Sequence, residues 1–173
     1  MKSTQQATAR AVFMGGLAMV ISASLLMTQE SLQPAHLPDF VHMTPGLYEL
    51  ATGCSFPLAA VTGVLLALCA AVGFAFAARS CKEVTTTFLR RLDHLTSTQR
   101  LLYALIGLLV AIAPIFVVTI QRNHMGSSWF FRLVATEPIA LSVFCAGLYI
   151  FNCGIFLFAS SLLGRSELLK GSH

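Results

Sequence analysis

The stretch RSCKEVTTTFLRRLDHLTSTQR, residues Arg79–Arg100, connects two apolar runs that are each long enough to cross a lipid bilayer. It carries five of the eleven Lys and Arg residues in the chain. Because short segments rich in Lys and Arg remain on the cytoplasmic side of a membrane, this connector indicates on which side the other segments lie. The topology of the whole chain is therefore predicted from it.

The connector has the pattern of an amphipathic helix. Ser80 and Glu83 have the spacing of a capping box, in which two side chains satisfy free backbone N–H groups at a helix start. Apolar residues then recur at helical spacing opposite a charged face. We predict a helix on the inner membrane surface that either contacts lipid or docks a cytosolic or membrane partner. Its apolar positions are Val84, Phe88, Leu92 and Leu95.

The composition excludes an ordinary soluble domain. Of the 173 residues, 56% are hydrophobic and 10% are charged, and the mean hydropathy is +0.77. In soluble domains roughly a quarter of all residues are charged. The formal charge of +4 arises from basic residues beside apolar runs, so we expect no nucleic-acid partner. The chain is predicted to be one domain, residues 1–173, in the lipid bilayer of a plasma or bacterial inner membrane.

Four apolar runs have lengths close to the roughly 20 residues that cross the hydrocarbon core. The first follows a basic segment and resembles a secretory signal, but it lacks a clean A-x-A cleavage site, so we expect a retained span. The predicted fold class is all-α, a polytopic membrane protein with four transmembrane helices and an amphipathic cytoplasmic connector helix. The spans are predicted at about residues 11–27, 56–78, 101–120 and 139–163.

The distribution of Lys and Arg predicts the orientation of these spans. Nine of these residues lie before the first run, in the connector and after the last run. Only Arg122 and Arg132 lie in the segments on the opposite side. Since the positive-inside bias is most reliable for short segments, we expect the N-terminus and the C-terminus to be cytoplasmic.

Small residues occupy every fourth position of the second run. Four residues advance a helix by about 400°, so these side chains form one slowly drifting stripe along the helix. Small side chains let a neighbouring backbone approach closely, and the stripe therefore predicts a helix-packing face. We call these positions the small-residue stripe: Ala59, Gly63, Ala67, Ala71 and Ala75.

The fourth run carries the most polar side chains. Ser142, Cys145 and Asn152 have spacings that place them on one helix face. Asn152 is the one strongly hydrogen-bonding side chain deep in any run, and in hydrocarbon it requires a partner. We expect that partner to be either a carbonyl group on a neighbouring helix or a bound ligand.

Two outer segments, residues 28–52 and 121–137, join the runs on the other side of the membrane. Three prolines interrupt the first, so we expect an irregular segment with one short interfacial helix that begins at Thr44 and Pro45. The apolar residues of that helix are expected at the headgroup level. The second segment is expected to place the aromatic residues Trp129–Phe131 at the membrane interface.

The first outer segment also contains a candidate metal site. His36, Asp39 and His42 are three residues apart, with Glu49 nearby in sequence and His124 in the other outer segment. Imidazole and carboxylate are ligands for zinc or copper. The alternative is that these side chains are simply solvated.

Several catalytic and carrier classes lack their required residues in the sequence. The five cysteines contain no C-x-x-C pair, which argues against a thiol oxidoreductase. The predicted spans contain no His to ligate haem and no Asp or Glu for proton coupling. The Ser and Cys residues in the spans have no His or acid nearby in sequence to act as a base. We expect no enzymatic activity and no cofactor.

The sequence therefore favours a non-catalytic accessory, scaffold or regulatory subunit of a membrane protein complex, with partner subunits or further copies of the chain. One alternative is a small substrate-binding or transport component that uses Asn152 and the polar face of the last run. The other is an extracytoplasmic metal-binding membrane protein.

Overall fold

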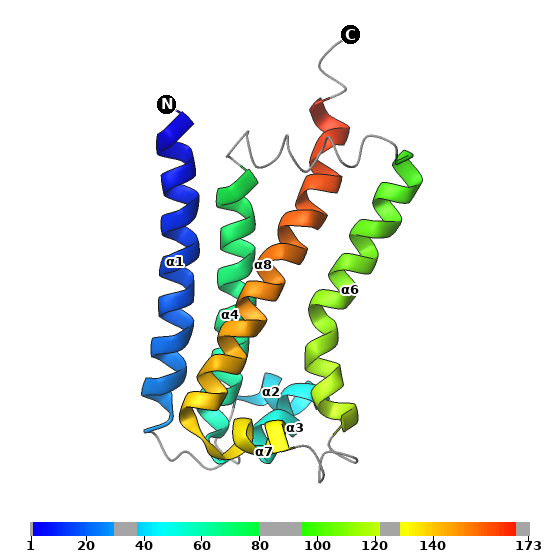
Figure 1. Cartoon of the computed structure of the whole chain (residues 1–173). Coiled ribbons are helices and arrows are strands. Elements are labelled where there is room, and N and C mark those ends of the chain that lie inside the picture. Colours follow the sequence, from blue (N-terminus) through cyan, green and yellow to red (C-terminus); the bar gives the residue numbers. More distant parts are fainter. Residues whose placement is uncertain (1, 30–37, 80–94, 122–128, 169–173) are drawn as a thin grey trace.

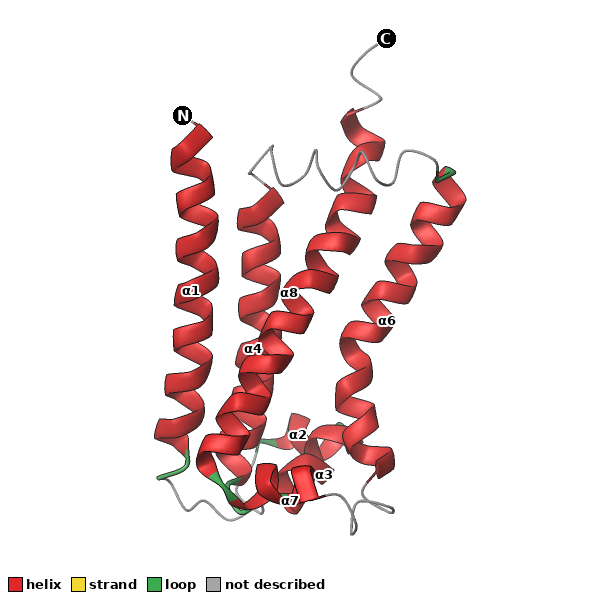
Figure 2. Ribbon diagram, in the orientation of Figure 1, coloured by secondary structure: helices red, strands yellow, loops and turns green. Residues whose placement is uncertain are grey.

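The structure is a computed structural model that describes residues 2–29, 38–79, 95–121 and 129–168. Throughout these residues the regular secondary structure is helical (Figure 2). The predicted connector helix lies outside the described residues. The four long helices are α1 (Lys2–Met27), α4 (Pro57–Arg79), α6 (Ser97–Gln121) and α8 (Pro138–Leu168), and the short helices are α2 (Asp39–Met43), α3 (Pro45–Gly53) and α7 (Trp129–Thr136).

Three helices are long and apolar enough to cross a membrane, namely Thr4–Met27, Pro57–Arg79 and Pro138–Leu162. A helix satisfies its own backbone hydrogen bonds, which is the requirement for a segment surrounded by lipid. These lengths and compositions indicate an integral membrane protein. The described apolar part of α6, Ser97–Ala111, is shorter, so the fourth span remains a prediction.

The bundle has two different ends (Figure 1). One end holds the start of α1, the end of α4, the start of α6 and the end of α8, and we call it the terminal end. The other holds α2, α3 and α7, and we call it the short-helix end. Lys2 and Leu168, the first and last residues that the structure describes, therefore lie on the same side of the bundle.

Helix α8 is the central element of the packing. It contacts α1, α4 and α6, while α1 also packs closely against α4. Helix α6 is held by α8 and, at the short-helix end, by α3, and its described residues hardly touch α4. The bundle is consequently open between α4 and α6, with α8 behind the opening.

The start of α6 is a capping box, and its spacing Thr96-x-x-Gln99 can be read in the sequence. The backbone N–H of Thr96 donates to Oε1 of Gln99 at 3.0 Å, and the backbone N–H of Gln99 donates to Oγ1 of Thr96 at 3.3 Å. These reciprocal bonds form a capping box and satisfy two donors that have no partner within the helix. The helix begins at Ser97, directly after this cap.

Helix α3 begins at Pro45, directly after Thr44, as the sequence predicts. The Thr44 hydroxyl donates to the carbonyl of Phe40 at 2.9 Å and makes no side-chain cap bond to α3. Leu47 and Leu50 are buried because α3 packs against α4 and α6, whereas Tyr48 is exposed. The position of this helix at the headgroup level stays a prediction.

The second outer segment contains a helix that the sequence analysis did not predict. Helix α7 exposes the rings of Trp129 and Phe130, which meet edge to face with centroids 6.3 Å apart, and it buries Val134. The N–H of Ser55 donates to the carbonyl of Ala135 at 2.8 Å and connects α7 to the chain just before α4. The second outer segment is therefore tied to the start of α4 by a backbone hydrogen bond.

Candidate functional site

The candidate site is the buried polar face of α8. Residues three and four apart on a helix lie on the same face, and this spacing relates Ser142, Cys145, Tyr149 and Asn152. All four are at most 3% exposed. Three of them were identified from the sequence, and Tyr149 was not.

Cys145 lies where α1, α4 and α8 meet. A Cβ atom built on Gly63 of α4 would lie 2.6 Å from Sγ of Cys145 and 2.7 Å from Oγ of Ser24 on α1. Real Cβ atoms do not come this close to other heavy atoms, so only glycine fits at position 63 without movement. The other stripe residues Ala59, Ala67, Ala71 and Ala75 are also buried.

Tyr149 connects α8 to α1. Its hydroxyl donates to the carbonyl of Phe13 at 3.0 Å, and the two rings lie with centroids 5.5 Å apart. A Cβ atom on Gly16 would lie 2.5 Å from the Tyr149 hydroxyl oxygen, so glycine makes room for this contact. The sequence shows a tyrosine inside one apolar run and the pair Gly15 and Gly16 inside another. Nothing in the sequence indicates that these two features contact each other.

Asn152 has one satisfied and one unsatisfied group. Its Nδ2 donates to the carbonyl of Leu148 on its own helix at 2.9 Å. One of the two sequence-based alternatives expected a carbonyl on a neighbouring helix instead. Its Oδ1 is buried and accepts no hydrogen bond from the residues that the structure describes. Leaving a buried acceptor unpaired costs about 1–3 kcal/mol. Oδ1 of Asn152 is therefore an open acceptor inside the bundle.

The buried hydroxyl groups on these helices are satisfied locally. Oγ of Ser142 donates to the carbonyl of Pro138 at 3.0 Å, Ser161 donates to Leu157 at 2.8 Å, and Ser24 donates to Val20 at 2.7 Å. Such bonds to a carbonyl one turn earlier let a hydroxyl lie in an apolar interior. In the structure these hydroxyl groups therefore serve the packing of the helices.

Of the candidate metal ligands, Asp39 and His42 are described, and they lie at the short-helix end. Asp39 and His42 are exposed on α2, and the His42 ring lies 5.2 Å from the Tyr48 ring. His36 and His124 lie outside the described residues. Within the described part of the chain, no group of three or more His, Cys, Asp or Glu side chains has a geometry that could hold a metal ion.

Cys54 lies just before α4 and is only partly exposed. Burial raises the pKa of its thiol from 9.0 to about 11, and the nearby Cys145 thiol adds to the shift. Because the thiolate is the nucleophilic form, the Cys54 thiol is a poor nucleophile at neutral pH. Cys145 and Cys153 are buried and free.

Comparisons with protein-family models, with curated proteins and with solved structures returned no match to this chain.

Proposed function

We propose that the chain is a non-catalytic accessory or scaffold subunit of a membrane protein complex in a plasma or bacterial inner membrane. In this proposal α6 is a fourth span, and the connector forms an amphipathic helix on the cytoplasmic surface. The capping box at Thr96 and Gln99 supports a helix that starts at the membrane surface.

The proposed orientation places the terminal end of the bundle in the cytoplasm. Arg10, Arg79 and Arg100 lie toward this end, on α1, α4 and α6. Arg132, on α7, lies at the short-helix end. This distribution agrees with the positive-inside bias and supports N-terminal and C-terminal segments on the cytoplasmic side.

The observation that carries the proposal is the exposed face of α6. The helix turns a narrow side of small residues toward α8, with Ala104 and Ala111 buried. Most of the other side chains between Leu101 and Val110 are apolar and exposed, and they surround the rest of this part of the helix. The exposed large side chains on it are Leu101, Leu102, Tyr103, Leu105, Ile106, Leu108, Leu109 and Val110.

Along its first half, α6 packs against α8 with one side, which leaves its other sides available to a helix of a second protein. Van der Waals packing drives association of helices in lipid, and a face with both bulky and aromatic side chains offers area for it. We therefore assign this face of α6 to a transmembrane helix of a partner subunit. A second copy of the chain is the alternative occupant.

Site-specific photo-crosslinking tests the assignment. A photoreactive residue at Leu109, which is 69% exposed on α6, should crosslink to one larger membrane protein. The same residue at Met19, which is 53% exposed on α1, is the matched control and should crosslink only to lipid. Equal labelling from both positions, or a crosslink only between two copies of the chain, would contradict the partner assignment.

A second candidate function rests on Asn152. Its unpaired Oδ1 is suited to accept a hydrogen bond from a small polar ligand that enters the bundle. In that case the chain is a substrate-binding or transport component. Asn152→Leu should then abolish binding or transport while the amount of assembled protein stays normal.

A further inference from the structure

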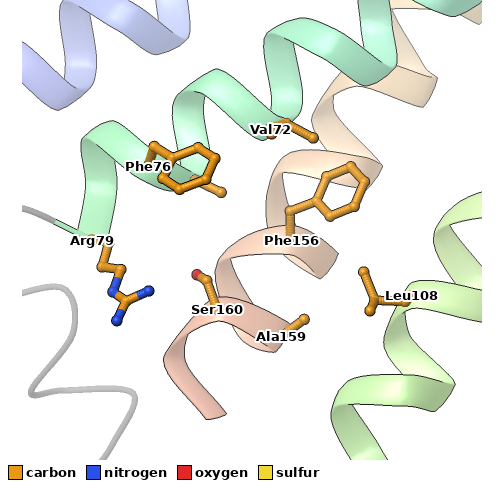
Figure 3. A pocket seen from close by; sticks show the side chains of 8 residues that line it. Val72, Phe76, Arg79, Leu108, Phe156, Ala159 and Ser160 are labelled. Carbon is orange, nitrogen blue, oxygen red and sulfur yellow. The ribbon is translucent and has the colours of Figure 1, made fainter. Parts of the chain in front are cut away.

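An apolar groove opens between α4 and α6 toward the terminal end, with α8 behind it (Figure 3). Its volume is about 270 Å³. Most of its lining is hydrocarbon, and the polar groups that line it are Arg79 and Ser160. The apolar walls include Val72 and Phe76 from α4, Leu108 from α6 and Phe156 from α8.

The groove has a charged end and an apolar end. Arg79 is in the last turn of α4, and Figure 3 shows its side chain beside Ser160 at the same end of the groove. Val72 and Phe156 line the part farther along the two helices. A molecule that matches this arrangement has an anionic group at one end and a hydrocarbon chain at the other.

The length of the groove fits one leaflet of a bilayer. From Arg79 to Val72 the helix rises about 10 Å. Half of the hydrocarbon core of a bilayer is about 15 Å thick. With Arg79 at the headgroup level, the apolar part of the groove therefore ends before the bilayer midplane.

A second groove, on the other side of α4, also combines an arginine with apolar walls. It lies between α1 and α4 toward the same end of the bundle, with a volume of about 320 Å³. Phe13, Met14 and Phe74 provide its apolar walls, and Arg10 is its charged group. Both grooves therefore combine an arginine with apolar walls toward the terminal end of the bundle.

We propose that the groove between α4 and α6 binds an anionic phospholipid of the leaflet at the terminal end. The guanidinium of Arg79 contacts the lipid phosphate, and one acyl chain lies along Val72, Phe76 and Phe156. Basic pockets between transmembrane helices recognise anionic headgroups in this way. The site shares Leu108 with the α6 face assigned to a partner, but its charged group and its other walls lie on α4 and α8, so either inference can fail without the other.

A free phosphate ion and a partner helix fit the groove less well. A phosphate ion needs several donors, whereas among the described lining residues Arg79 is the one cation. A partner helix would need the whole length of the opening, whereas the groove occupies only the part near the terminal end. The single charge of Arg79 matches the phosphate of one lipid headgroup, and the apolar groove beside it matches an acyl chain.

Tryptophan quenching by brominated lipids measures binding at this groove alone. The chain has one tryptophan, Trp129, so Trp129→Phe removes the background and Phe76→Trp places a reporter in the groove wall. In vesicles that mix phosphatidylglycerol and phosphatidylcholine, brominated phosphatidylglycerol should occupy the groove about fivefold in preference. A reporter at Ile150, which is 50% exposed on α8, is the control and should show no preference.

Variants of Arg79 connect the preference to this side chain. Arg79→Gln should abolish the preference for phosphatidylglycerol at the Phe76→Trp reporter. Arg79→Lys should retain most of this preference because the positive charge remains. Arg132→Gln, on α7, removes one charge at the opposite end and should leave the preference unchanged. The helical circular dichroism of each variant shows whether it has folded.

Three results would overturn the proposal. They are an equal response of the groove reporter to both lipids, a preference that survives Arg79→Gln, and a preference that Arg132→Gln removes equally. Added inorganic phosphate should leave the preference intact, and its loss at millimolar phosphate would identify a free-anion site instead.

Discussion

The hydroxyl of Tyr149 donates a 3.0 Å hydrogen bond to the carbonyl of Phe13, and this bond joins α8 to α1 across 136 positions of the sequence. Around it, Gly16 leaves space for the hydroxyl, and the Phe13 ring packs against the Tyr149 ring. The contact fixes how α1 lies relative to the centre of the bundle. The first prediction concerns this bond.

Tyr149→Phe should lower the free energy of unfolding modestly, because it removes the hydrogen bond and retains the ring. Hydrogen bonds between helices in membranes contribute about 0.6 kcal/mol on average, with a maximum near 1.7 kcal/mol. Detergent-induced unfolding followed by circular dichroism measures the change. Tyr48→Phe is the control, since Tyr48 is exposed at the short-helix end. Equal stability of the Tyr149 and Tyr48 variants would show that the bond contributes nothing.

Gly63→Ala should destabilise the bundle by about 1–3 kcal/mol, because the added methyl group would overlap Cys145 and Ser24. Gly73→Ala in the same helix is a matched control, since a Cβ atom there meets nothing within 4 Å. The control should be neutral or slightly stabilising, as alanine favours helices. Thermal unfolding of both variants in the same detergent distinguishes the positions. A harmless Gly63→Ala would mean that α1, α4 and α8 are not this close.

The sequence predicted local features of the fold better than contacts between helices. The capping box at Thr96 and Gln99 could be predicted because its two partners are three residues apart and their bonding needs no other part of the chain. The bond from Tyr149 to Phe13 could not be predicted, since it depends on how two distant helices are rotated. Helix α7 was missed because its aromatic residues fit an interfacial loop equally well.

The candidate site was predicted in part. The spacing of Ser142, Cys145 and Asn152 indicated a shared face, and all three are buried in the structure. The partner of Asn152 was the harder question, because a side chain can bond to its own helix or to a neighbour and the spacing does not distinguish them. The structure gives its Nδ2 a partner on its own helix and leaves Oδ1 without one.

Asn152→Leu should leave the free energy of unfolding of the isolated chain unchanged or raise it, because leucine removes a buried acceptor that has no partner. The gain is at most about 3 kcal/mol. Chemical unfolding of the isolated chain measures it. The same variant should also assemble normally under the scaffold proposal. Lost assembly would show that a partner donates to Oδ1, and lost ligand binding with normal assembly would favour the transport alternative.

Alkylation of Cys54 should continue to accelerate up to about pH 11, because burial raises its pKa from 9.0 to about 11. At pH 8 the rate should be about 100-fold below that of a thiol with a pKa of 9. Labelling of a variant with Cys54 as its one cysteine, with the unfolded chain as control, measures both rates. A plateau near pH 9 in the folded protein would contradict the burial of this thiol.

The same shift makes stability depend on pH. The folded state favours the neutral thiol, so its contribution to stability is complete below about pH 9 and is lost as the pH rises through about 11. Replacing Cys54 with serine should remove this dependence. Unfolding measured at pH 8 and pH 10.5 for both forms checks the sign.

The mass and composition of the complex in mild detergent test the scaffold proposal most directly. Native mass spectrometry should find the 18.6 kDa chain together with a larger membrane protein in fixed stoichiometry. Alanine at both Leu105 and Leu109 on α6 should release that partner, whereas alanine at both Met19 and Leu26 on the exposed side of α1 should not. A chain found only alone or as multiples of its own mass, or a partner that both double variants release equally, would contradict the proposal.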